Sequence, residues 1–153
     1  MSFFLFRINM KPIVFGIYGV SNSGKTNLIV ELVKTLKFQG FKVAAVKKSD
    51  KNIGIDTNGK DTYKYGEAGS DLVVFSSPVE TDFLIKNEMD EDEIVQNIKK
   101  MLDVDIILVE GCIAEDVPKI KIGNIADRKN TIMVYENNFE QILNMIKTKY
   151  DGV

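Results

Sequence analysis

The chain has 153 residues, of which 44% are apolar and 27% charged, a composition typical of a globular domain rather than a disordered or collagen-like chain. It contains one cysteine, Cys112, and no histidine, which excludes an intrachain disulfide, a Ser-His-Asp triad and a histidine-ligated metal site. The net charge of −2 argues against nucleic acid as a partner, because nucleic-acid binders usually carry a basic excess.

The start of the chain shows no membrane signal. The apolar run Phe3–Phe6 is too short for a membrane-spanning helix and lacks the features of a signal peptide. Together with the lone thiol, this predicts a cytoplasmic protein with no membrane partner. A strong strand pattern begins just after Met10, so we expect residues 1–9 to be an N-terminal extension or a start assigned too early, and residues 10–153 to form a single domain.

The first half of the chain opens with a predicted βαβ unit. The apolar, β-branched run Ile13–Tyr18 predicts a strand buried on both faces. Apolar residues at helical spacing over 28–36 predict a helix that ends at Gly40, and Phe41–Val46 predicts a second strand. The polar residues 47–60 predict a long loop, which in a small domain is usually functional or mobile.

After residue 60, predicted helices and strands continue to follow one another along the chain. Residues 61–68 predict a short helix that stops near Gly69. Further strands are predicted over 72–75, 82–85, 105–109, 119–122 and 131–135, and further helices after the acidic residues 90–93 and over 139–146. Alternating strands and helices predict an α/β fold with an open, mostly parallel, twisted sheet and helices on both faces.

A phosphate-binding motif follows the first predicted strand. Residues Gly19–Thr26 match the pattern G-x-x-x-x-G-K-[ST], and they lie between a strand and an amphipathic helix, as this motif requires. Its glycines let the loop turn N–H groups toward an anion. Lys25 would supply charge to the β and γ phosphates, and the Thr26 hydroxyl would bind Mg²⁺. We therefore expect a P-loop NTPase whose nucleotide-binding residues are Gly19, Ser21, Asn22, Ser23, Gly24, Lys25, Thr26 and Asn27.

Three carboxylates are candidates for the metal or the γ-phosphate. Glu110 ends a buried strand, at the edge where open sheets bind ligands, and we interpret it as a metal or water contact rather than a solvated strand end. Asp105, at the other end of that strand, is interpreted as a turn residue. Asp56 and Asp61 either have local roles, such as a helix cap at Asp61, or reach the metal when the loop closes, and the pattern leaves both alternatives open.

Further blocks follow the P-loop in a recognisable order: Gly59–Tyr63 with Glu67–Gly69, then Val109–Gly111, then Pro118–Ile120. In this order they resemble the MobB-type molybdopterin-guanine dinucleotide biosynthesis proteins over roughly residues 10–125. The resemblance implies a P-loop fold of the class that holds signal-recognition GTPases and dethiobiotin synthetase. It also implies GTP binding with Mg²⁺, slow hydrolysis, a homodimer and partnership with the MobA-type guanylyltransferase that attaches GMP to molybdopterin. Molybdopterin or its metal form is a further candidate partner.

The resemblance also implies roles for individual residues. Those it places around the phosphates and metal are Gly24, Lys25, Thr26, Asp56, Asp61 and Glu110. We therefore expect Glu110 and Asp61 to be catalytic, and Thr26, Glu110 and Asp56 to be metal ligands.

The chain departs from the family in two places. The family usually has histidines after the second strand, where this chain has Lys47–Asp50, so any role of those histidines is not inherited. It usually has Phe-Lys after Glu-Gly, where this chain has Cys112–Ile113, which leaves the local partner surface open.

The choice of GTP over ATP depends on the resemblance. The guanine-binding pattern N/T-K-x-D is absent, and Asn124–Asp127, which has the Asn and Asp but lacks the lysine, is treated as a loop. Arg128, the one arginine in the predicted core, is either a hydrolysis-accelerating group or a surface residue, and without such a group hydrolysis is slow. Alternatives to a GTP-binding adapter are an ATP-dependent ligase or kinase resembling dethiobiotin synthetase, and a P-loop domain acting only in protein contacts.

Overall fold

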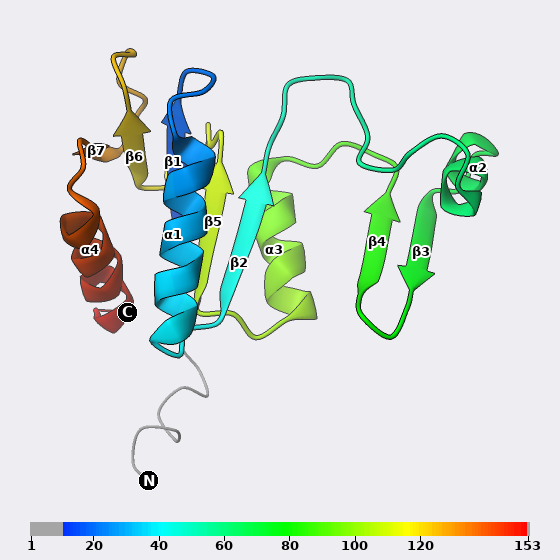
Figure 1. Cartoon of the computed structure of the whole chain (residues 1–153), viewed down its shortest axis with the longest axis horizontal. Coiled ribbons are helices and arrows are strands. Elements are labelled where there is room, and N and C mark those ends of the chain that lie inside the picture. The colour runs from blue at the N-terminus through cyan, green and yellow to red at the C-terminus, as the bar shows by residue number, and fades with distance from the viewer. Residues whose placement is uncertain (1–10, 153) are drawn as a thin grey trace, which may run out of the picture. The chain divides into compact units, whose positions relative to one another are not determined.

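The computed structural model describes residues 11–152, so the expected extension over residues 1–9 lies outside the described part. The elements in chain order are β1 (Ile13–Gly19), α1 (Lys25–Phe38), β2 (Val43–Lys47), α2 (Asp61–Glu67), β3 (Leu72–Ser76), β4 (Thr81–Ile85), α3 (Glu91–Met101), β5 (Ile106–Glu110), β6 (Lys119–Ile122), β7 (Thr131–Tyr135) and α4 (Phe139–Asp151) (Figure 1). The described residues divide into two compact units, one formed by residues 11–49 and 91–152, the other by Asp50–Asp90.

The first unit is built on a five-stranded sheet in the order β2-β5-β1-β6-β7. Every neighbouring pair in it is parallel, which confirms the predicted α/β class. From β1 the chain passes to β2 on one side, whereas from β5 it passes to β6 on the other side of β1. The loops after β1 and β5 therefore diverge at the carboxyl edge of the sheet, the arrangement that creates a ligand crevice in open α/β sheets.

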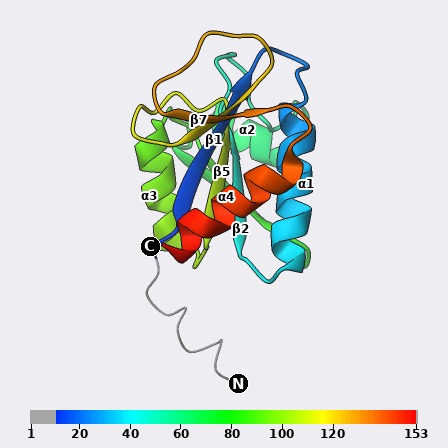
Figure 2. The same ribbon diagram turned by 90° about the vertical axis from the view of Figure 1, so that its left-hand side faces the viewer.

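Helices cover both faces of this sheet, as predicted: α3 lies on one side, and α1 and α4 lie on the other (Figure 2). The core on the α1 side includes Phe15, Ile17, Leu28, Leu32, Leu108, Ile142 and Ile146. The core on the α3 side includes Val95, Ile107, Val109 and Cys112. Because side chains alternate along a strand, Leu108 and Glu110 of β5 share the α1 face, while Ile107 and Val109 share the α3 face.

Two predictions near the amino edge of the sheet need correction. The second strand begins at Val43 rather than Phe41, because Phe41 belongs to the turn after α1 and packs its ring edge-on against Tyr150, with the centroids 5.2 Å apart. Asp105 is more than a turn residue. Its carboxylate is buried and accepts hydrogen bonds from the Lys42 N–H and the Tyr150 hydroxyl, both at 2.7 Å, and so links β5 to α4.

The second unit contains α2 and an antiparallel hairpin. In the hairpin, Leu72 pairs with Ile85 and Val74 pairs with Phe83, so these four apolar side chains lie on one face. All four are about half exposed. The α2 helix ends just before Gly69, as predicted, but it begins with Asp61 as its first helical residue and Lys60 at the capping position, so the proposed cap at Asp61 is wrong. Over residues 11–152, no helix is both long and apolar enough to span a membrane.

Candidate functional site

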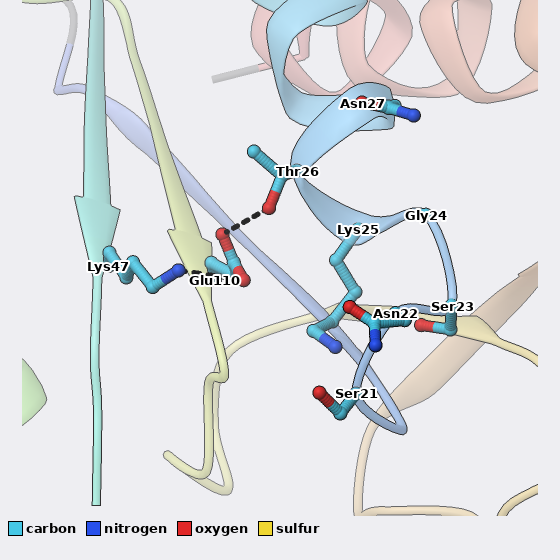
Figure 3. Close-up of a pocket in the computed structure, with 9 residues that line it drawn as sticks. All are labelled: Ser21, Asn22, Ser23, Gly24, Lys25, Thr26, Asn27, Lys47 and Glu110. Carbon is cyan, nitrogen blue, oxygen red and sulfur yellow. Dashed lines mark hydrogen bonds and ion pairs between the residues drawn. The ribbon is translucent and has the colours of Figure 1, made fainter. Parts of the chain in front are cut away.

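A pocket of about 350 Å³ lies in the first unit at the carboxyl edge of the sheet (Figure 3). Its lining residues are Ser21, Asn22, Ser23, Gly24, Lys25, Thr26, Asn27, Lys47 and Glu110. All the residues from 21 to 27 that were predicted to bind nucleotide are in this set, together with Glu110. The structure thus brings together the loop after β1, the start of α1 and the ends of β2 and β5.

The loop after β1 depends on two glycines in different ways. Gly24 precedes α1 with a φ of 96°, a left-handed conformation that costs other residues strain. At Gly19 the limit is space, because an added Cβ would clash with the carbonyl oxygen of Ile122 and lie 2.7 Å from Ser23 Oγ. Both positions therefore require glycine for the loop to keep its shape.

The partial positive charge at the N-terminus of α1 is not balanced by the helix's own side chains. The capping residue, Gly24, makes no side-chain hydrogen bond to the helix, and the first turn contains no acidic residue. The N–H groups of a first turn have no partners within their own helix, and the helix dipole adds a partial positive charge there. This end of the pocket is therefore suited to an anion such as phosphate.

Lys25 and Thr26 leave the first turn of α1 in different directions. The Lys25 ammonium donates to the carbonyl oxygens of Gly19 at 3.0 Å and Val20 at 2.6 Å, which holds it against the loop. The Thr26 hydroxyl donates to Glu110 Oε2 at 3.3 Å, across to the end of β5 (Figure 3). The side chain of Asn27 points away from Glu110 in the same view.

Glu110 has a second partner that the sequence did not suggest. Lys47 ends β2 and is its register partner across the parallel pair, so both side chains are on the same face of neighbouring strands. The Lys47 ammonium lies 3.7 Å from Glu110 Oε1. The Glu110 side chain is 14% exposed and that of Lys47 is 71% exposed, since β2 is an edge strand of the sheet.

The donor set at this end of the pocket fits Mg²⁺. The Thr26 hydroxyl and the Glu110 carboxylate are hard oxygen ligands, and their oxygens are already within 3.3 Å of each other. Magnesium in proteins is usually held by one or two such groups, with phosphate oxygens and water completing its octahedron. Thr26 and Glu110 would therefore hold the ion against a bound polyphosphate.

Asp56 and Asp61 belong to the second unit and are not among the pocket's lining residues. Asp56 Oδ1 accepts hydrogen bonds from the Thr57 N–H at 2.9 Å and the Thr62 hydroxyl at 3.2 Å, which ties the loop to the start of α2. The exposed Asp61 carboxylate lies 3.6 Å from the Lys64 ammonium, one turn further along the helix. These are local roles, and the roles of both residues toward a metal or γ-phosphate stay predictions.

The segment Asn124–Asp127, which has part of the guanine-binding pattern and was predicted to be a loop, does not line the pocket. Lys121, at the end of β6, donates to Asp127 at 2.5 Å and to the Ile125 carbonyl at 3.3 Å. The hydrogen bond with Asp127 raises the pKa of Lys121 above its ordinary value. Asp127 thus has a lysine partner that the linear N/T-K-x-D pattern could not reveal.

Arg128 supports the loop after β5 and does not line the pocket. Its guanidinium donates to the carbonyls of Cys112 at 2.6 Å and Gly111 at 3.3 Å. The same group lies 4.7 Å from the centre of the Tyr18 ring, a distance at which a cation is attracted by the aromatic face. Arg128 is therefore neither directed at the pocket nor a free surface side chain.

Two buried charges, Glu91 and Lys119, also hold this loop through contacts that no local pattern in the chain predicts. Glu91, at the start of α3, accepts hydrogen bonds from the N–H groups of Ile113 and Ala114, both at 2.7 Å, and from Cys112 Sγ at 3.2 Å. The ammonium of Lys119 is fully buried and donates to the carbonyls of Ala114, Val117 and Lys129.

Burial and the neighbouring Glu91 raise the pKa of the Cys112 thiol to about 12, so it is protonated at neutral pH. A protonated, fully buried thiol is unsuited to nucleophilic chemistry, which agrees with its interpretation as a packed core residue.

Comparison with known proteins gives consistent matches. A model of the MobB family, described as molybdopterin guanine dinucleotide synthesis protein B, matches residues 14–148. A molybdopterin-guanine dinucleotide biosynthesis adapter protein from Haemophilus influenzae is 33% identical over 118 residues, which cover 76% of this chain and 65% of the relative. A putative adapter protein of the same name from Methanocaldococcus jannaschii is 29% identical over 147 residues, which cover 90% of this chain and 61% of the relative.

The chain therefore spans less than two thirds of the length of these curated relatives. Among solved structures, Bacillus subtilis MobB superposes with a TM-score of 0.71 at 16% identity, over 90% of this chain and 97% of that one. At this identity the superposition supports the fold alone.

Proposed function

The chain belongs to the MobB family, as the motifs predicted, and from this premise we propose that it is an adapter in molybdopterin-guanine dinucleotide biosynthesis that binds GTP with Mg²⁺. The observation that carries the nucleotide part is the pocket that Lys25, Thr26 and Glu110 line beside the uncapped start of α1. A helix N-terminus, an ammonium and hard oxygen ligands suit a magnesium-bound polyphosphate. The preference for GTP over ATP comes from the family.

We expect any hydrolysis by this protein to be slow. An arginine directed at the transferring phosphoryl group accelerates such reactions by roughly 10³–10⁵-fold. The one arginine within residues 11–152 is Arg128, whose guanidinium is bound to two loop carbonyls rather than directed into the pocket. Slow turnover fits a protein that uses its nucleotide to control assembly with a partner enzyme.

The proposed partners are a second copy of the chain and the MobA-type guanylyltransferase that attaches GMP to molybdopterin, with molybdopterin or its metal form as a candidate ligand. The apolar face of the β3–β4 hairpin supports a protein partner of some kind, since large exposed apolar faces usually mark contact surfaces. Copurification with the guanylyltransferase tests the adapter role, and an absence of association in the presence of GTP and Mg²⁺ would contradict it.

Thermal unfolding with GTP, GDP or ATP, each with and without Mg²⁺, tests the nucleotide part. A ligand at 100 times its Kd adds about 2.7 kcal/mol to the free energy of unfolding, which raises Tm by roughly 5–10 °C for a domain of this size. We expect the largest shift with GTP and Mg²⁺. Equal shifts with ATP and GTP would instead favour the ATP-dependent ligase or kinase.

Two variants locate the binding site in the same assay. Lys25→Ala should remove most of the shift, because it deletes the ammonium of the phosphate loop. Thr26→Ala should mainly remove the dependence on Mg²⁺, because it deletes one of the two oxygen ligands. A full shift in Lys25→Ala would show that the nucleotide binds elsewhere.

A further inference from the structure

Lys47 lines the pocket although it belongs to neither the phosphate-loop motif nor the set of predicted site residues. Its position follows from the fold: β5 lies between β1 and β2, which makes Lys47 the register partner of Glu110. In Figure 3 the Lys47 side chain extends toward Glu110 and Thr26, on the opposite side of the pocket from Ser21 and Ser23. The pocket therefore has a second ammonium, at the end where the metal ligands lie.

The ion pair between Lys47 and Glu110 is loose. Its N–O distance is 3.7 Å, and the Lys47 side chain is 71% exposed. Pairs in which one partner is this well solvated contribute little to stability, so the ammonium can leave Glu110 at small cost. Lys25 differs, because its ammonium is held by two loop carbonyls at 3.0 and 2.6 Å. Of the two lysines that line the pocket, Lys47 is therefore the less firmly held, so its charge can reach a ligand in addition to that of Lys25.

We propose that Lys47 is a second phosphate-binding residue of this pocket and favours nucleoside triphosphates over diphosphates, an inference that rests on the proposed nucleotide binding. Its charge balances Glu110 in the structure. A Mg²⁺ held by Thr26 and Glu110 would balance that carboxylate instead and would leave the ammonium able to contact the ligand. The terminal phosphate of a triphosphate would lie near these metal ligands, so a cation beside Glu110 would contact a group that a diphosphate lacks.

The test measures dissociation constants of GTP and GDP with Mg²⁺ by isothermal titration calorimetry. Loss of one charge-assisted contact predicts that Lys47→Met weakens GTP binding about tenfold and GDP binding less than about twofold, while Lys47→Arg keeps most of the preference. Lys42→Met is the matched control. Lys42 lies just before β2, at the opposite end of the strand, and forms an exposed pair with Asp103 at 2.7 Å, so its loss should change neither constant.

A second pair of variants separates contact with phosphate from an effect through Glu110. If Lys47 contacts the terminal phosphate, the double variant Lys47→Met/Glu110→Gln should bind GTP more weakly than Glu110→Gln alone. If the two variants bind GTP equally well, Lys47 acts only by neutralising Glu110 and the inference is overturned. Equal weakening of GTP and GDP, or none, also overturns it. A wild-type protein that binds no nucleotide contradicts the proposed function itself, whereas a binding protein insensitive to Lys47→Met contradicts this inference alone.

Discussion

Glu91 combines burial with a full set of hydrogen bonds. Burial alone raises the pKa of its carboxyl, but the N–H groups of Ile113 and Ala114 and the Cys112 thiol outweigh this and bring the pKa below its ordinary value. These three hydrogen bonds stabilise the ionised form of Glu91 in the native state. Its contribution to stability is therefore present above the unfolded pKa of 4.5 and is lost as the pH falls through the native pKa.

We expect Glu91→Gln to lower the free energy of unfolding by about 1–3 kcal/mol at pH 7, because an amide cannot accept from both backbone N–H groups as the carboxylate does. The difference from wild type should shrink as the pH falls below 4.5, because the stabilisation by the native carboxylate is lost as the pH approaches and passes its lowered pKa. Urea unfolding at neutral pH and near pH 3 measures both values. Glu115→Gln, which removes an exposed carboxylate paired with Lys129, should cost at most about 0.5 kcal/mol. An unchanged gap for Glu91→Gln at the two pH values would contradict this explanation.

The shape of the phosphate loop, the element between β1 and α1, depends on Gly19 and Gly24, so alanine at either position should lower the free energy of unfolding. Gly19→Ala places a methyl group against the Ile122 carbonyl of β6, which is backbone and cannot move aside, so we expect a loss of about 3 kcal/mol. Gly24→Ala meets no atom within 4 Å but forces alanine into a φ of 96°, for which we expect about 1–2 kcal/mol.

Chemical denaturation of the two variants compares a steric cost with a conformational one. Both should also lose part of the thermal shift with GTP, since both change the loop that we propose binds the phosphates. A greater loss of stability in Gly24→Ala than in Gly19→Ala would contradict this account of the loop.

Among the predicted elements, the clearest are β1 and β5, which are continuous apolar runs, and α1, whose apolar residues recur at helical spacing. Both patterns are visible in a single chain because burial selects apolar residues. The phosphate loop was predictable for a similar reason, since its backbone shape restricts which residues fit.

What the sequence did not predict depends on contacts between distant segments. The pairing of Lys47 with Glu110 requires β5 to lie between β1 and β2, which no local pattern reveals. Glu91 resembles an ordinary acidic helix start until the loop at Ile113 and Ala114 supplies its partners. Asp56 and Asp61 show the same limit, because their predicted roles depend on a loop closure that has no signature in the residues themselves.

At the scale of the whole molecule, the hairpin of the second unit stands out because its apolar face is exposed. A two-stranded hairpin is marginally stable alone and usually needs a third layer or further strands. Here Leu72, Val74, Phe83 and Ile85 form one face, and each is about half exposed. A second copy of the chain that covers this face would remove apolar surface from water, and a two-fold pair can do so with the same patch on both copies.

We therefore expect the protein to sediment as a dimer and Phe83→Lys to shift it toward monomer, because the lysine would bring a charge into the proposed contact. Val79→Lys is the control, since Val79 is 90% exposed in the turn between the strands and outside the apolar face. Sedimentation velocity over a range of concentrations, with circular dichroism to verify folding, gives the result. If wild type is monomeric throughout, or if Phe83→Lys remains as dimeric as Val79→Lys, then this face does not join two copies, and the guanylyltransferase becomes the partner to test against it.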